Sequence, residues 1–441
     1  MKTFYIKTLG CKVNQIESEY IADTLIKQGY QLVRWQEADV LLLNTCIVTH
    51  KAEKECRKII RKWKKETKAI LVIMGCYPQA FLESLKNWIT KENLKERTII
   101  LGQVEKLEVA DVLKALTEGR LKLPYVKIDG LTKETSCKLL ECERLYFHSR
   151  AFLKVQDGCD QFCTYCIVPY ARGKPRSVPL EEIIFQAEKL VKRGYRELVL
   201  TGIHLGKWGK DLGLDFVTLL TELEKHLKRL NIPIILRLSS IEPNEVTQKF
   251  LNFIKTSKFI APHFHIPLQS GSNRILKAMN RPYTREFYEE VVFNLKEIFP
   301  DATIGADVIV GFPGETEEDF KETYELIENS PLNWLHIFPY SVRPGTLAEK
   351  INPKVPPSEI KFRESLLKSL IQKKRKEFLK TQLNKTKKAI VEKKEDDFYR
   401  CITENYLTVY VKGKELKPKQ LILLSIKSLN EKILGEILKV M

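Results

Sequence analysis

The chain has 441 residues, of which 44% are hydrophobic and 29% are charged, with 74 Lys and Arg against 56 Asp and Glu. This length and apolar content predict about two to four folded domains and exclude a largely disordered chain. The net charge of +18 favours a polyanionic partner, although solvated helix faces would also hold such lysines.

Neither a membrane segment nor a disulfide framework is indicated. The opening residues contain no apolar signal region, and the longest apolar runs, such as Ala69–Met74, are too short to cross a bilayer. Ten cysteines in a chain of this length, several of them clustered, indicate metal ligands in a reducing compartment. We therefore expect a cytoplasmic protein with no membrane partner.

Residues 1–120 alternate apolar strands with helical patterns, which predicts a Rossmann-like parallel sheet with helices on its faces. The expected strands are Thr3–Thr8, Asp39–Asn44, Ala69–Met74 and Thr98–Leu101. The expected helices are Ile16–Gln28, with Asn14 as a possible cap, and the basic amphipathic segment His50–Lys65.

Cysteines follow three of these strands. Cys11 comes after the first strand, Cys46 after the second and Cys76 after the third. Because parallel strands point the same way, all three are expected beyond one edge of the sheet, where open α/β folds place their sites. They are candidate metal ligands; the alternative is three unrelated buried cysteines.

Residues 121–145 form the expected linker, which is rich in Lys and Thr. It contains Cys137 and Cys142, whose spacing fits no metal motif well. We interpret these two cysteines as incidental. Cys56, inside the basic helix, and Cys401, in a strand-like stretch near the end, are interpreted as structural.

From residue 146 to residue 352 the alternation of strand and helix begins again, which predicts a partial (β/α)6 barrel rather than a closed eightfold one. The expected strands are Ala151–Gln156, Glu197–Thr201, Ile234–Leu238, His263–Ile266, Thr303–Val310 and Asn333–Tyr340. Glycines and polar residues follow several of these strands, where barrels carry their function.

The first barrel strand leads into the loop Cys159-Asp-Gln-Phe-Cys163-Thr-Tyr-Cys166. Thiolates are the usual protein ligands of iron–sulfur clusters, and three thiolates leave one iron of a cubane open for a substrate. The alternatives are a chance cluster and a zinc knuckle. A knuckle needs a fourth Cys or His at close spacing, and the nearest histidine, His148, lies upstream.

The sequence of residues 353–380 predicts a basic connector helix that begins at proline. The sequence of residues 381–441 predicts a small β-barrel of a kind that binds nucleic acid. The expected strands are Ala389–Glu392, Tyr406–Val411, Leu421–Lys427 and Glu436–Val440. The expected fold class is therefore α/β, with a Rossmann-like domain, a partial barrel and a terminal β-barrel.

These motifs resemble those of the radical S-adenosylmethionine (radical SAM) methylthiotransferases over essentially the whole chain. The resemblance rests on the three N-terminal cysteine motifs and on three longer segments of the barrel. These are KVQDGCDQFCTYCIVPYARG from Lys154, PLQSGSNRILKAMNR from Pro267 and DVIVGFPGETEEDF from Asp307. The terminal barrel stands where this family carries its RNA-binding TRAM domain.

The segments TLGCKVNQIES and LNTCIVTH are similar to those of the branch that acts on N6-threonylcarbamoyladenosine next to the tRNA anticodon, at position 37. The resemblance implies two 4Fe-4S clusters and SAM as cofactors. The cluster on Cys159, Cys163 and Cys166 would bind and cleave SAM. The cluster on Cys11, Cys46 and Cys76 would supply or hold the sulfur that becomes a 2-methylthio group.

The implied partners are a tRNA anticodon stem-loop, an electron donor such as flavodoxin or ferredoxin, and a sulfur source. At the barrel mouth, the residues expected near SAM are Gly202, Ser239, Gln269 and Gly311. Arg172 and Arg176 are expected to meet a substrate carboxylate or phosphate, the alternative being a structural ion pair. Tyr340 is expected either to stack on a base or to pack.

Three other functions stay open at this point. One sibling enzyme methylthiolates N6-isopentenyladenosine in tRNA, and another modifies a protein side chain. The third possibility is a non-enzymatic RNA-binding iron–sulfur protein, which would not cleave SAM under reduction.

Overall fold

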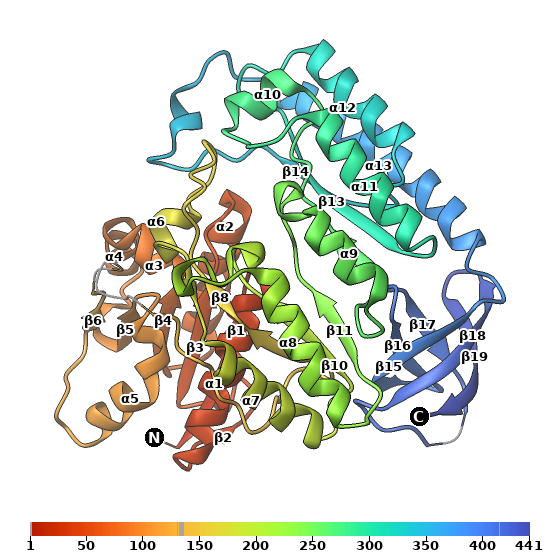
Figure 1. The fold of residues 1–441 in the computed structure, drawn as a ribbon. Helices are drawn as coiled ribbons and strands as arrows, with labels where there is room; N and C mark the ends of the chain where they lie inside the picture. The colour runs from red at the N-terminus through yellow and green to blue at the C-terminus, as the bar shows by residue number, and fades with distance from the viewer. Residues whose placement is uncertain (1, 130, 132–135, 414) are drawn as a thin grey trace.

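The computed structural model describes residues 2–129, 131, 136–413 and 415–441. The N-terminal α/β part lies on one side of the molecule, the incomplete barrel takes the middle, and a small β-barrel ends the chain (Figure 1). The predicted α/β class is confirmed. In the part of the chain so described, no helix combines the length and the apolarity needed to span a membrane.

The N-terminal part is a parallel sheet with strand order β2-β1-β3-β4-β5-β6. Its strands are β1 Thr3–Thr8, β2 Gln31–Leu32, β3 Val40–Thr45, β4 Ile70–Gly75, β5 Thr98–Leu101 and β6 Tyr125–Lys127. Its helices are α1 Lys12–Lys27, α2 His50–Glu66, α3 Cys76–Ala80, α4 Leu82–Lys91 and α5 Val109–Thr117. Strand β6 extends the sheet into residues 121–145, part of which lies outside the described residues.

Alternation along β3 explains why helices cover both faces of this sheet. Leu41 and Leu43 pack with α2 and α4, whereas Val40 and Leu42 pack with α1 and α5. All four side chains are fully buried, and each such burial stabilises the fold by roughly 1.5–3 kcal/mol. The apolar run of β3 is therefore that of a strand covered on both faces.

Helix α1 begins earlier than the sequence predicts, and Asn14 is not its cap. The N-cap residue is Cys11, and Asn14 lies inside the helix. The Asn14 side-chain amide donates to the Leu9 carbonyl (2.8 Å) and the Thr45 carbonyl (2.9 Å). Asn14 thus joins the loops after β1 and β3, and these two loops carry Cys11 and Cys46.

The middle of the chain is an incomplete barrel of six main parallel strands. The ladders β11-β10-β7 and β12-β13-β14 are linked by a bridge between Leu236 and Ile260. The strands are β7 Ala151–Lys154, β10 Glu197–Thr201, β11 Ile235–Leu238, β12 His263–His265, β13 Thr303–Val310 and β14 Trp334–Pro339. The helices are α6 Val168–Arg172, α7 Leu180–Lys192, α8 Phe216–Arg229, α9 Gln248–Thr256, α10 Asn273–Ala278, α11 Arg285–Ile298 and α12 Glu317–Asn329.

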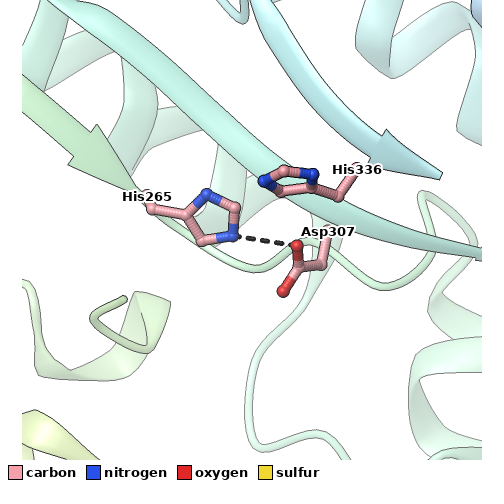
Figure 2. Close-up of side chains that lie close together, drawn as sticks. All are labelled: His265, Asp307 and His336. Atoms are coloured by element: carbon pink, nitrogen blue, oxygen red, sulfur yellow. Dashed lines mark ion pairs between the residues drawn. The ribbon is translucent and has the colours of Figure 1, made fainter. Parts of the chain in front are cut away.

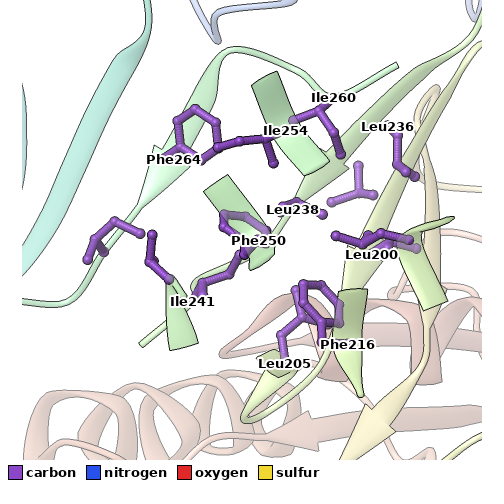
Figure 3. Close-up of a cluster of buried hydrophobic side chains, with 14 of the residues drawn as sticks. Leu200, Leu205, Phe216, Leu236, Leu238, Ile241, Phe250, Ile254, Ile260 and Phe264 are labelled. Atoms are coloured by element: carbon purple, nitrogen blue, oxygen red, sulfur yellow. The ribbon is translucent and has the colours of Figure 1, made fainter. Parts of the chain in front are cut away.

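Apolar side chains between these strands and the outer helices hold the barrel together. Figure 3 shows Leu200 and Leu238 from the strands facing Phe216 of α8 and Phe250 of α9. The two phenylalanine rings stack with centroids 6.5 Å apart. The polar residues of the same strands are thereby left to the inside of the barrel and to the strand ends.

Helix α13, Pro357–Lys380, leads to a closed barrel with strand order β15-β16-β17-β19-β18. Its strands are β15 Thr386–Glu395, β16 Phe398–Thr403, β17 Thr408–Val411, β18 Leu421–Leu429 and β19 Ile433–Val440. Strand β16 is not among the strands expected from the sequence. A charged run at the end of β15 and the turn Asp396–Asp397 obscure the hairpin that β15 and β16 form.

The turn between β16 and β17 closes the lower end of the central barrel. The guanidinium of Arg237 donates to the carbonyls of Thr403 (3.2 Å) and Glu404 (2.9 Å). The Thr303 hydroxyl donates to the Asn405 carbonyl at 2.6 Å. The C-terminal barrel is thus fixed to the N-terminal strand ends, which leaves the opposite end of the central barrel open to the N-terminal part.

Candidate active site

The Cys159–Cys166 loop follows β8 (Gln156–Asp157), which pairs with β9 (Arg176–Ser177). Gly158 has a φ of +79°, and a Cβ there would lie 2.0 Å from the Lys174 carbonyl oxygen. Only glycine therefore lets the chain turn out of β8 at this point. The Cys159 amide donates to the Gly173 carbonyl (2.9 Å), and the Cys166 amide donates to that of Cys163 (2.9 Å).

The three thiols of this loop are free and partly exposed, and polar groups contact two of them. Arg281 Nη1 donates to the Cys163 sulfur at 3.2 Å, and His204 Nδ1 lies 3.2 Å from the Cys159 sulfur. Burial raises the pKa of the Cys166 thiol to about 12, so a metal would displace a proton on binding. Free thiols with nearby cationic donors fit an iron–sulfur cluster.

Glu245 holds His204 in its place beside Cys159. His204 Nε2 lies 2.7 Å from Glu245 Oε1. Burial lowers the pKa of His204, but its contacts with Cys159 and Glu245 outweigh burial and raise that pKa to about 9. The histidine was not identified from the sequence, because its partners are far away along the chain.

The N-terminal cysteines lie at one edge of their sheet, as predicted. Cys11 follows β1, Cys46 follows β3 and Cys76 begins α3 directly after β4. Gly10 has a φ of +100°, and a Cβ on it would lie 2.8 Å from the Cys46 Cβ. All three thiols are free, with Cys11 exposed and the other two buried. This set also fits a cluster, and its role as a ligand set stays a prediction.

A cluster of buried charges joins the two cysteine regions. Glu17 of α1 pairs with Lys106 (2.5 Å), Lys154 (3.0 Å) and Arg172 (3.2 Å). Asp157 pairs with the last two of these, Lys154 (2.6 Å) and Arg172 (2.8 Å). We call these five residues the buried charge cluster. It contains three cations and two carboxylates, and therefore carries one surplus positive charge.

The surplus charge lies next to the N-terminal cysteines. Burial raises the pKa of the Cys76 thiol, and Arg172 and Lys106 oppose that rise. Burial also raises the pKa of Glu17, but the cations of the cluster outweigh it and lower that pKa to about 2. The cluster therefore favours negative charge on Cys76 while it holds α1 against the barrel.

Of the two arginines expected to contact the substrate, Arg172 is engaged in ion pairs within the protein, whereas the buried Nε of Arg176 has no partner among the described residues, and its contact with the substrate stays a prediction. Arg172 is buried and donates to Glu17, Asp157 and Asn14, as the structural ion-pair alternative requires. Arg176 is also buried, and its Nη2 donates to the Arg172 carbonyl at 2.9 Å. The partners of Arg172 come from α1 and β8, and nothing in the local sequence indicates them.

The four residues expected near SAM follow four barrel strands. Gly202, Ser239, Gln269 and Gly311 come after β10, β11, β12 and β13, respectively. The buried Ser239 hydroxyl has no hydrogen-bond partner among the described residues, which fits a polar ligand. A Cβ on Gly311, however, would lie 2.4 Å from Ile360 of α13, so this glycine is needed for packing. Contact of the four with SAM stays a prediction.

Tyr340 lies just after β14, and its ring contacts Phe312 edge-on at 5.7 Å between centroids. Its hydroxyl is buried with no partner within the described ranges. Both packing and a ligand contact are compatible with this geometry. Cys56, by contrast, is fully buried, and its thiol faces the Cys46 carbonyl at 3.8 Å, which agrees with a structural role.

One further feature was not identified from the sequence, and another lies along a helix that the sequence marks as basic. His265, Asp307 and His336 lie together inside the barrel, and the available signal was a polar residue in each of three apolar strands. The second feature is a groove of about 1020 Å³ along α2. It is lined by His50, Glu53, Lys54, Arg57, Lys58, Arg61, Lys62, Lys64, Lys65, Glu66 and Glu92.

Comparison with known proteins agrees with these observations. A family model described as the radical SAM superfamily matches residues 153–327, and one described as the uncharacterized protein family UPF0004 matches residues 3–95. The chain is 43% identical to an Aquifex aeolicus protein named threonylcarbamoyladenosine tRNA methylthiotransferase MtaB, over 92% of this chain and 96% of that protein. A Bacillus subtilis protein of the same name is 36% identical, over 94% and 91%.

A second group of relatives has a different name. A Thermotoga petrophila protein named tRNA-2-methylthio-N(6)-dimethylallyladenosine synthase is 36% identical, over 88% of this chain and 86% of that protein. Among solved structures, the radical SAM methyltransferase TsrM from Kitasatospora setae has a TM-score of 0.54 at 14% identity. The match covers 77% of this chain and 73% of that one, and at this identity it shows the fold alone.

Proposed function

The chain belongs to the tRNA methylthiotransferases of the radical SAM superfamily, and we propose that its substrate is N6-threonylcarbamoyladenosine at position 37 of tRNA. The product would be the 2-methylthio derivative of that base. The observation that carries the proposal is the 43% identity, over nearly the full length of both chains, to a relative named for this substrate. Because the chain belongs to a family of enzymes, the alternative of a non-enzymatic RNA-binding iron–sulfur protein is disfavoured.

We propose that two cysteine sets hold two 4Fe-4S clusters. The first cluster would be held by Cys159, Cys163 and Cys166 and would bind SAM. The second cluster would be held by Cys11, Cys46 and Cys76. When bound, the first supplies the electron that cleaves SAM and the second supplies or holds sulfur. An electron donor such as flavodoxin or ferredoxin and a sulfur source belong to the same proposal.

The protein's own residues would orient these groups and exclude water. Support comes from Arg281 and His204 beside the first cysteine set and from the buried charge cluster beside the second. The C2–H of adenine is neither acidic nor electrophilic, so a radical must activate it inside a chamber shielded from water. Ser239 and Tyr340, with their unpartnered hydroxyls, are the side chains we propose to line that chamber.

The substrate assignment is tested by mass spectrometry of tRNA nucleosides from cells with and without the gene. Deletion is expected to remove 2-methylthio-N6-threonylcarbamoyladenosine and to leave its unmethylthiolated precursor in its place. The isopentenyladenosine derivative should be unaffected, which provides the internal control. Loss of the isopentenyl derivative with retention of the threonylcarbamoyl derivative would transfer the chain to the second group of relatives.

We propose that the groove along α2 binds tRNA phosphates. Three lysines are exposed on it, Lys54, Lys58 and Lys65. Among the described residues their one ion pair is the weak one of Lys58 with Glu55 at 3.9 Å. Replacing all three with alanine is expected to weaken tRNA binding roughly tenfold at physiological salt. The slope of log affinity against log salt should fall by about 0.7–0.9 for each phosphate that the variant no longer neutralises.

A matched control removes the same number of charges elsewhere, at Lys114 of α5, Lys225 of α8 and Lys321 of α12, all exposed. Filter binding or fluorescence anisotropy over a salt series measures both triple variants. SAM cleavage without tRNA should be the same in both. If the control weakens tRNA binding as much as the α2 variant, the groove is not the RNA-binding surface.

A further inference from the structure

Three polar side chains gather inside the barrel, from the end of β12 and from within β13 and β14 (Figure 2). His265 Nε2 lies 2.9 Å from Asp307 Oδ1, and the rings of His265 and His336 have centroids 5.4 Å apart. One ligand atom from each residue falls within 4.8 Å of the others. Asp307 and His265 are partly buried and His336 is exposed, so the group is open to a bound molecule.

Lys12, the first residue of α1, carries a half-buried ammonium with no ion pair or hydrogen bond within the portion of the chain described. The neighbouring cations differ in this respect. Arg237 pairs with Glu197 at 2.7 Å, and Arg150 pairs with Glu392 at 3.2 Å and with Glu197 at 3.5 Å. Glu197 and Glu392 are therefore already paired with arginines, and no carboxylate of the described residues forms an ion pair with Lys12.

Lys12 lies near His336 and His263, since its charge acts on the pKa of both side chains. Partial burial lowers the pKa of His336, Asp307 opposes that effect, and His265 and Lys12 lower the pKa further. Below them, Tyr406 from the C-terminal barrel stacks on His263 with ring centroids 4.3 Å apart and forms the floor. The inside of the barrel thus has a closed floor and polar walls. Its charged groups near the histidines are Lys12, which has no ion pair among the described residues, and Asp307, which pairs with His265.

Such surroundings suit a polar, anionic group and not an apolar one. An apolar substituent placed here would remove Lys12, Asp307 and the two histidines from water without giving them partners, which is costly. A carboxylate would instead form a charge-assisted hydrogen bond with Lys12. Two histidines and a carboxylate also suit a divalent cation, but the ammonium of Lys12 nearby opposes a second positive charge.

We propose that Lys12, His265, Asp307 and His336 form the pocket for the N6 substituent of the target base, with Lys12 as the counter-ion of its carboxylate. This inference rests on the proposed function, because threonylcarbamoyl carries a carboxylate whereas isopentenyl carries none. Lys12 directly follows Cys11 in the chain, so the residue proposed to recognise the substituent is the neighbour of a proposed cluster ligand.

The test compares Lys12→Met with the wild-type enzyme, both carrying reconstituted clusters. The RNA substrates are anticodon stem-loops with N6-threonylcarbamoyladenosine and the same RNA with its carboxylate converted to a primary amide. For the acid substrate, the variant is expected to lose about 10- to 100-fold in kcat/KM for methylthio transfer. For the amide it should lose less than about threefold. Lys12→Arg should restore most of the activity on the acid, because it keeps the charge.

Lys114→Met on α5 is the control for loss of a lysine, and iron content and SAM cleavage are measured for every variant. Equal losses on acid and amide, or loss of iron in Lys12→Met, would overturn the inference, because Lys12 would then act on folding or on the cluster. A stoichiometric non-iron metal that is lost in His336→Ala would overturn it too. No metal beyond iron is expected.

The proposed function fails separately. One outcome is that the wild-type enzyme modifies an isopentenyladenosine stem-loop but neither the acid nor the amide form of the threonylcarbamoyladenosine stem-loop. In that case the substrate assignment itself is wrong. If the wild-type enzyme modifies the threonylcarbamoyl RNA but does not distinguish acid from amide, the assignment holds and only the role of Lys12 is wrong.

Discussion

Replacing Cys11 with alanine is expected to abolish methylthio transfer while reductive cleavage of SAM continues. Cys11 is exposed at the N-cap of α1, so its truncation removes a thiol without opening a cavity in the core. The loop of Cys159, Cys163 and Cys166 is built on separate strands and should keep its cluster. Anaerobically reconstituted wild-type protein should hold about eight irons per chain and the variant about four, since each cubane has four.

Two control variants make this result decisive. Cys163→Ala is expected to lose both SAM cleavage and methylthio transfer, because it affects the set that we propose to hold SAM. Cys56→Ala is expected to keep both, although Cys56 is buried beside Cys46. If Cys11→Ala kept full iron and full transfer, or if Cys56→Ala behaved as Cys11→Ala should, the proposed second ligand set would be wrong.

The cysteine positions were predictable because each follows an apolar strand whose ends the sequence marks clearly. Strand β3, for example, is a run of buried residues between Asp39 and Cys46, and its placement also locates Cys46. Strand β2, with two residues, and β6, with three, were missed because they are too short to give a periodic signal.

The environments of the arginines and of the barrel histidines were not predictable in the same way. Arg172 follows the cysteine loop, but its partner Glu17 lies 155 positions away in the sequence. His265, Asp307 and His336 meet only because β12, β13 and β14 are neighbours in the sheet. Spacing along the chain identifies ligands within one loop or at equivalent strand ends, whereas these pairs depend on tertiary packing.

Replacing Arg172 with methionine is expected to destabilise the packing of the N-terminal part against the barrel by about 3–5 kcal/mol, because buried acceptors on Glu17, Asp157 and Asn14 each lose a charged donor. The two carboxylates keep the two lysines, so the loss comes from these hydrogen bonds and not from an unbalanced charge. Urea unfolding at pH 7 and hydrogen exchange in α1 would measure the loss. Arg229→Met, an exposed position at the end of α8, should be nearly neutral.

The same cluster predicts a pH dependence with a definite sign. The pKa of Glu17 is lowered from 4.5 to about 2 in the folded protein, because its three cations outweigh the effect of burial. Its stabilisation should therefore be fully present above pH 4.5 and should be lost as the pH falls toward about 2. Because Glu17→Gln carries no titrating carboxylate there, its unfolding free energy should fall less steeply than that of the wild type over this range. An equally steep fall in Glu17→Gln would show that other carboxylates govern the acid response and that Glu17 is not the anion that holds α1 to the barrel.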